Sequence, residues 1–140
     1  MAEKLASLKK KGGKMSETVL WTNASPTSAF SGQNVLLSDH VSNYKYIEIQ
    51  YDIYASLNHY MSSIYKVSDL LVMNTPSSNS NYWRTDLSAI YQNYVFTRLG
   101  YLYDNTHFHF DDNIWFTSSG TVQRGTNNQS IIPIQIIGLK

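Results

Sequence analysis

Hydrophobic and polar residues alternate along most of the chain from Glu17 onward, and the clearest alternation runs over Lys45–Tyr54. One face of that segment carries Ile47, Ile49, Tyr51 and Ile53, and the other carries Glu48, Gln50 and Asp52. A period of two with one apolar face is typical of an antiparallel strand that lies on a core. We therefore expect the apolar face to be buried, as we do for Phe108 and Phe110, and the polar face to be exposed or at an interface.

Similar short runs predict strands at 18–22, 34–37, 58–67, 69–73, 82–86, 89–99, 106–110, 114–117 and 131–139. The segment Asp111–Asn113, between two of these runs, is typical of a hairpin turn. Pro133 cannot donate to a strand ladder, so it predicts an edge position or a bulge in the last strand. Since no long segment has helical periodicity, we predict an all-β fold, an antiparallel β-sandwich of jelly-roll type with about 8–10 strands.

Length and composition narrow the class of protein further. A chain of 140 residues, 42% of them hydrophobic, is long enough for one domain with a buried core. It contains no cysteine, which excludes a disulfide scaffold, a thiolate zinc site and cysteine catalysis. The net charge of +1 gives no reason to expect nucleic acid as a partner. No run approaches the ~20 apolar residues of a membrane helix, so we expect no membrane partner.

The charge is unevenly distributed. Residues 1–15 hold five lysines and one glutamate, a net charge of +4, whereas residues 16–140 carry −3. We therefore divide the chain into a basic leader, residues 1–15, and a β-sandwich domain, residues 16–140. Three interpretations of the leader stay open: a solvated or cloning-derived tail, a peptide that docks on a partner, and a basic arm for nucleic acid. A docking peptide would bind through its apolar pair and would recognise an acidic groove through its positive charge. The residues concerned are Leu5, Leu8, Lys9, Lys10, Lys11 and Lys14.

Candidate chemistry is sparse. His107, His109 and Asp111 share one face of a strand, but two histidines alone make no metal site, so they are a weak candidate that a trimer axis would have to complete. No G-x-S-x-G elbow and no phosphate-binding glycine loop occurs. The neighbouring carboxylates Asp111 and Asp112 would point to opposite faces of an extended strand, unlike an opposed glycosidase pair. We therefore expect no enzymatic activity and no cofactor.

The tyrosines suggest a binding surface instead. The chain contains 11 of them, more than one small core requires. Tyrosine and tryptophan offer apolar area with a polar tip, are enriched at interfaces, and also stack on sugar rings. The candidate ligand or interface aromatics are Tyr44, Tyr82, Trp83, Tyr101 and Tyr103.

Two segments carry a resemblance to a known group of proteins. Residues 18–37 (TVLWTNASPTSAFSGQNVLL) open with a short strand and a Ser-Pro-Thr-Ser-Ala-Phe loop, and the chain closes on 131–140 (IIPIQIIGLK). With the strand-like segment Asn43–Tyr54 between them, they resemble small β domains of virion structural proteins from tailed phages and prophages of Gram-positive bacteria. The resemblance covers about residues 17–140 and carries over no catalytic residue.

The resemblance implies a virion protein that is not an enzyme. The leading expectation is a host-adhesion module, a receptor-binding or fibre head, anchored through its N-terminal leader. Its expected partners are other virion proteins of the tail, baseplate or capsid, host surface carbohydrate, and further copies of itself, with a trimer favoured. One alternative is a capsid decoration or head-fibre protein, and another is a phage-associated cell-wall glycan hydrolase.

Overall fold

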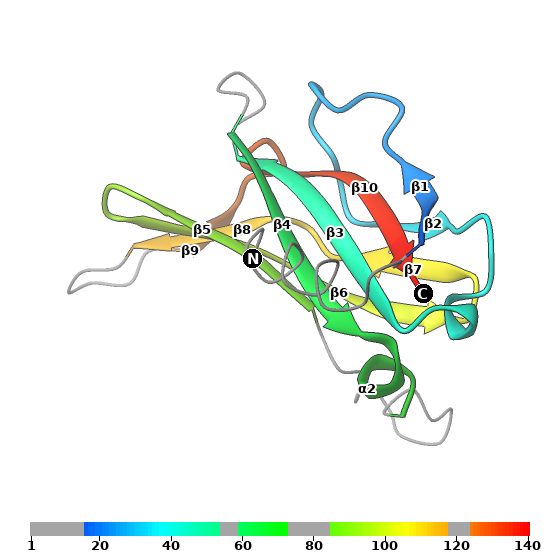
Figure 1. Cartoon of the computed structure of the whole chain (residues 1–140). Helices are drawn as coiled ribbons and strands as arrows, with labels where there is room; N and C mark the ends of the chain where they lie inside the picture. Colours follow the sequence, from blue (N-terminus) through cyan, green and yellow to red (C-terminus); the bar gives the residue numbers. More distant parts are fainter. Residues whose placement is uncertain (1–15, 54–58, 73–84, 118–123) are drawn as a thin grey trace.

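Two antiparallel sheets pack face to face in the computed structural model, which describes residues 16–53, 59–72, 85–117 and 124–140 (Figure 1). The four-stranded sheet has the order β1(Glu17–Thr22), β10(Ile131–Leu139), β3(Tyr46–Ile53), β4(His59–Lys66). The six-stranded sheet has the order β2(Gln33–Leu36), β7(His107–Phe110), β6(Tyr94–Asp104), β8(Ile114–Thr117), β9(Arg124–Thr126), and β5(Thr85–Tyr91) also pairs with β6. A short 3₁₀ helix, η1(Val41–Asn43), and one helix, α2(Val67–Val72), complete the described elements. The prediction of an all-β sandwich is confirmed.

The core lies between the two sheets and is built by alternating side chains. Ile47 and Ile49 of β3 and Phe108 and Phe110 of β7 are fully buried, as the sequence predicts, whereas Ile53 is half-buried. Burying a side chain of this size contributes roughly 1.5–3 kcal/mol. Trp21 packs at the end of this core, with its ring 5.7 Å from that of Phe110.

The polar face of β3 departs from the prediction. Gln50 is half-buried, but Glu48 and Asp52 are only 2% and 3% exposed. The alternation identified the two faces correctly, since the apolar members lie in the core. Two carboxylates are nevertheless shielded from water on the opposite face.

Two predicted strands have a different structure. Residues 69–73 were expected to be extended, but most of them belong to α2, which follows β4 without a gap. Val67 and Leu70 are buried and Leu71 packs beside them, a spacing of three and four residues that suits a helix. The single strand expected over 89–99 is a hairpin, in which Tyr91 of β5 pairs with Tyr94 of β6. Gln92 turns the chain with a φ of 55°.

The predicted hairpin turn at Asp111–Asn113 is also wrong. β7 pairs with residues 100–104 of β6, and β8 pairs with residues 94–97 of the same strand. The three residues therefore interrupt what would otherwise be one long strand beside β6. β10 has a bulge between Pro133 and Gln135. Because β10 pairs with both β1 and β3, it is an interior strand of its sheet. Of the two positions expected for this proline, the bulge is the one observed.

Candidate functional site

A cavity of about 490 Å³ lies on the outer side of the six-stranded sheet, where residues 111–113 interrupt the strand between β7 and β8. We call these three residues the interruption. Its polar lining comes from His109, Asp111, Asp112 and Thr126, and its remaining walls from Gly32, Leu99 and Ile114. A volume of this size matches ordinary small-ligand sites of about 300–1,000 Å³. The cavity therefore has room for a small ligand.

Arg98 fixes the interruption from the core side of the sheet. Its side chain is fully buried in β6, where its Nε and two Nη atoms donate to the backbone oxygens of Ile131, Asp111 and Phe30 at 2.8, 2.6 and 2.7 Å. Burial lowers the pKa of Arg98 to about 10, although the nearby Asp112 and Asp111 carboxylates act in the opposite direction. The guanidinium is thus charged at neutral pH and joins three chain segments beneath the cavity.

Asn113, the last residue of the interruption, fixes it to neighbouring segments through hydrogen bonds. Its buried side chain donates to the Thr97 backbone oxygen at 2.9 Å and accepts from the Ile131 amide at 2.8 Å. Its own backbone amide donates to Asn128 Oδ1 at 2.8 Å. These contacts fix the backbone that presents Asp111 and Asp112 to the cavity.

Asp112 is an ionised acceptor on the cavity rim. Its Oδ1 accepts from the Gly32 amide at 2.7 Å and from Asn128 Nδ2 at 3.0 Å. The Gly32 contact, followed by that from Asn128, lowers the pKa of Asp112 below its ordinary value. Gly32 is required for this approach, because a Cβ there would lie 2.9 Å from the Asp112 backbone nitrogen.

His109 and Tyr101 form a flat pair of rings next to the cavity. Their centroids are 4.8 Å apart and the planes are inclined by 29°. His109 Nδ1 lies 2.6 Å from Asn34 Oδ1, and Nε2 lies 3.0 Å from Asp111 Oδ1. The imidazole is therefore held at both nitrogens, and its ring orientation is set by two neighbouring chain segments.

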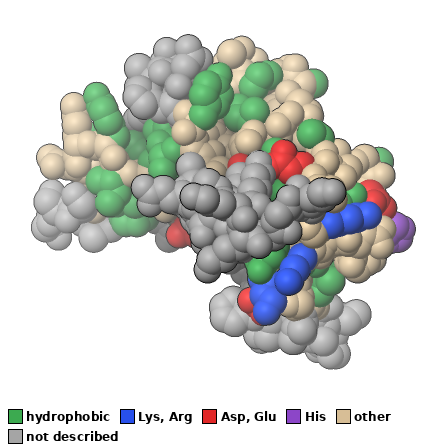
Figure 2. Space-filling view, viewed as in Figure 1, with side chains coloured by type: hydrophobic (Ala, Val, Ile, Leu, Met, Phe, Trp, Pro, Cys, Tyr) green, Lys and Arg blue, Asp and Glu red, His purple; other side chains and the backbone are tan. Residues whose placement is uncertain are grey.

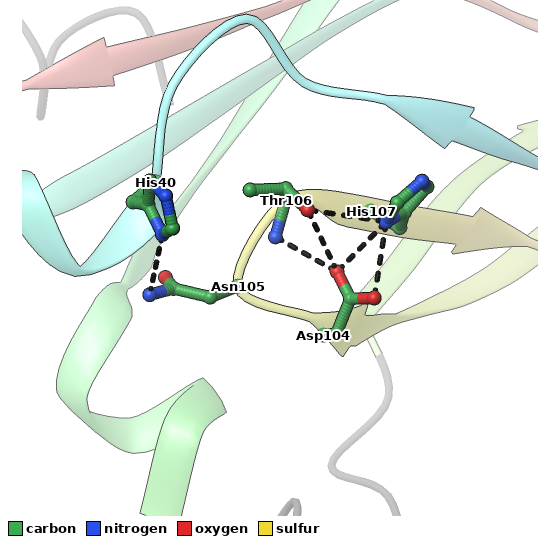
Figure 3. Close-up of polar contacts among 5 residues, drawn as sticks. All are labelled: His40, Asp104, Asn105, Thr106 and His107. Carbon is green, nitrogen blue, oxygen red and sulfur yellow. Dashed lines mark hydrogen bonds and ion pairs between the residues drawn. The ribbon is translucent and has the colours of Figure 1, made fainter.

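A second histidine–aspartate pair lies at the β6–β7 turn (Figure 3). His107 Nδ1 is 2.9 Å from Asp104 Oδ1, and the Thr106 amide donates to the same oxygen at 2.8 Å. Slight burial acts to raise the pKa of Asp104, but the Thr106 amide and His107 outweigh it and the pKa lies below its ordinary value. In the same turn, Asn105 Nδ2 lies 3.1 Å from His40 Nδ1. These contacts close one end of the sandwich and leave His107 engaged in a turn.

The weak metal candidate gains no support from this arrangement. His107 and His109 each pair with a different aspartate, Asp104 and Asp111. In residues 16–53, 59–72, 85–117 and 124–140, no three histidine, aspartate or glutamate side chains are grouped to hold a metal ion.

The predicted aromatics have different fates. Tyr101 lies at the site and Tyr103 is 52% exposed. Tyr44 is buried in the core, with its hydroxyl donating to Asp39 Oδ2 at 2.8 Å, so its ring packs the fold and offers no ligand surface. Tyr82 and Trp83 lie outside the described residues, as do the leader residues Leu5, Leu8, Lys9, Lys10, Lys11 and Lys14.

Sequence reasoning missed Arg98, Asn34 and Gly32. A signal for Arg98 was present, because it shares the core face of its strand with Phe96. Asn34 and Gly32 reach the site from β2 and the loop before it, far from His109 in the sequence.

The site as a whole offers carboxylate acceptors, an imidazole and an aromatic face around a shallow cavity, which is chemistry suited to a hydroxyl-rich ligand. Among the described residues, no helix is long and apolar enough to span a membrane. A comparison of the chain with protein-family models and with curated protein sequences finds no match.

Proposed function

We propose that this protein is a non-enzymatic surface module of a phage virion that binds a neutral, hydroxyl-rich glycan of its host. The observation that carries the binding part is the Tyr101–His109 ring pair beside a cavity lined by Asp111 and Asp112. The virion part rests on the resemblance of residues 17–140 to phage structural domains.

The chemistry of the cavity favours sugars over anionic wall polymers. Carboxylates accept hydrogen bonds from hydroxyl groups, and an aromatic face stacks on the C–H groups of a sugar ring. Two carboxylates on the lining would repel phosphate or uronate groups, and the Arg98 guanidinium is already bonded to three backbone oxygens. The expected ligand is therefore uncharged.

The electrostatics support binding without hydrolysis. A glycosidase needs one carboxylic acid whose pKa is raised, so that it can protonate the leaving oxygen. The pKa of Asp112 is lowered, chiefly by the Gly32 amide, which is the opposite of what such an acid requires. Hydrolysis of the host wall is the result that would favour the enzyme alternative.

The experiment is a binding and turnover assay on purified host cell wall and its separated fractions. We expect the protein to bind the neutral polysaccharide, not the anionic polymer, and to release no reducing sugar. Tyr101→Ala should weaken binding about tenfold, equivalent to about 1.4 kcal/mol. Tyr60→Ala is the matched control, because Tyr60 is exposed on the other sheet. Equal binding by both variants, or no binding to any fraction, would refute the proposed site.

Two parts of the proposal need the virion itself. Mass spectrometry of purified virions tests whether the protein is incorporated, and its position among tail or capsid proteins separates adhesion from capsid decoration. Attachment through the leader stays a prediction, since residues 1–15 lie outside the described part.

A homo-oligomer, with a trimer favoured, also remains a prediction. The β5–β6 hairpin projects from the sandwich (Figure 1), and the Ile90 side chain on it is 76% exposed. The hairpin is therefore a candidate contact between copies of the chain. Native mass spectrometry of the protein and of Ile90→Asp tests it: loss of the oligomer in the variant would support the hairpin as the contact.

A further inference from the structure

The outer face of the four-stranded sheet contains buried groups that the main core does not explain. Ile64 and Ile137 are each 7% exposed and Leu139 is fully buried, yet all three lie outside the core cluster of the described residues. Ile64 and Ile137 flank Glu48 in the strand register, so they share the face opposite Ile47 and Ile49. Figure 2 shows hydrophobic and acidic side chains side by side on this face.

Two carboxylates on this face of the described chain each have one oxygen without a hydrogen-bond partner, although Glu48 Oε1 accepts from Gln50 Nε2 at 3.2 Å. Glu48 and Asp52 are at least 97% buried, and within the described part of the chain Glu48 Oε2 and Asp52 Oδ1 have no hydrogen-bond partner. A buried carboxylate without a partner is costly, and natural proteins pair such groups with a cation. The face therefore combines apolar side chains with two buried carboxylate oxygens that have no donor among the described residues. We name this surface, formed by Glu48, Asp52, Ile64 and Ile137, the acidic face.

We propose that the basic leader, residues 1–15, docks on the acidic face of its own chain. The leader carries a net charge of +4 and places Leu5 and Leu8 among its lysines. Lysine ammonium groups would donate to the two carboxylate oxygens that have no partner in the described part, and the leucines would pack on Ile64 and Ile137. An acidic groove selected by the leader's charge was expected on a partner protein, and this sheet offers one within the chain itself.

The connection and the reach are both suitable. The leader joins β1 at Ser16, and β1 is the edge strand of the same sheet. Crossing from β1 to β4 requires three strand spacings, about 14 Å. Lys9 is seven residue steps from Ser16, which span up to about 23 Å when extended, so Lys9 reaches every strand of the sheet without strain.

The test uses disulfide trapping in the full chain, which is unambiguous because the protein has no cysteine. Ser7→Cys is combined with Ser62→Cys, which lies opposite Gln50 on the outer face. The matched control combines Ser7→Cys with Ser88→Cys, an exposed position on the other sheet. We expect a monomeric disulfide in high yield for the first pair and only background yield for the second.

Charge variants test the cause of docking. Glu48→Gln with Asp52→Asn should lower the yield of the first pair to that of the control. Lys9, Lys10 and Lys11 changed together to Glu should do the same without altering any residue of the sheet, and 1 M salt should act similarly because the Debye length falls to about 3 Å.

A background yield for the first pair would overturn the proposal, as would a yield that no charge variant changes. A disulfide that forms only between two chains would also overturn it, since the occupant would then be the leader of a second copy. None of these outcomes depends on glycan binding, so the two proposals fail independently.

Discussion

Replacing Arg98 by methionine is the sharpest test of how the candidate site is supported. Methionine has a similar length but no donor, so the backbone oxygens of Ile131, Asp111 and Phe30 each lose a charge-assisted hydrogen bond. Such bonds contribute about 1.5–3 kcal/mol each, roughly 6 kcal/mol together. Removing the buried charge recovers part of this, about 3 kcal/mol from the lowered pKa. The expected loss of unfolding free energy is therefore about 3 kcal/mol.

The assay is urea denaturation followed by tryptophan fluorescence, with thermal melting as a second measure. For a domain of this size, about 3 kcal/mol corresponds to a fall of roughly 10 °C in Tm. Lys66→Met is the control, because it removes an exposed cation from β4 and should change stability by less than about 0.5 kcal/mol.

Arg98→Lys separates charge from geometry. A single ammonium cannot reach three oxygens in different directions, but it keeps the cost of a buried charge. We therefore expect the lysine variant to be at least as unstable as the methionine variant. A lysine variant with wild-type stability, or a methionine variant within about 0.5 kcal/mol of wild type, would refute this account of Arg98.

Three further predictions concern single positions. Gly138→Ala should destabilise the protein by about 1–3 kcal/mol in thermal melting, because the added Cβ would lie 2.5 Å from the Tyr44 ring. Gln92→Gly should raise the urea midpoint by the equivalent of about 0.5–1 kcal/mol, since a φ of 55° strains a non-glycine residue; an unchanged or lower midpoint would contradict this. Asp112→Asn should weaken the domain by less than about 1 kcal/mol at pH 6, because the carboxylate is exposed to solvent. The pKa of Asp112 is lower in the folded state, so the gap between wild type and variant should close as the pH falls from about 4 towards 2 in urea titrations, and a gap that persists at pH 2 would be inconsistent with it.

The sequence was sufficient to predict the layers but not how their surfaces are covered. Alternation in β3 correctly assigned Ile47 and Ile49 to the core, because a period of two is a direct consequence of strand geometry. The same alternation could not show that Glu48 is shielded on the opposite face, since a pattern within one strand carries no information about what lies above it. For α2, the spacing of Val67, Leu70 and Leu71 was a helical signal, but it is too short to outweigh an apolar run typical of a strand.

The candidate site was less predictable than the fold. His109 and Tyr101 were identified as candidates separately, yet nothing in the sequence indicates that β6 and β7 place their rings in contact. The doublet Asp111–Asp112 predicts a hairpin turn, because residues of that type favour turns wherever a strand reverses or is interrupted. Only the pairing of β7 and β8 with one strand distinguishes a break from a turn.

The position of β10 has a consequence for how the protein is made. β10 follows every other described strand in the sequence, yet it lies between β1 and β3, and a hydrogen bond from Asn23 Nδ2 to the Pro133 oxygen already spans 110 residues. During synthesis the edges of β1 and β3 therefore stay without their partner until the chain beyond Leu139 has emerged. We therefore expect the four-stranded sheet to fold slowly, since distant pairings have to close a long loop first. Unpaired strand edges in that interval are exposed to association with other chains, so yield in the cell should depend more on temperature and expression rate than on the stability of the finished domain.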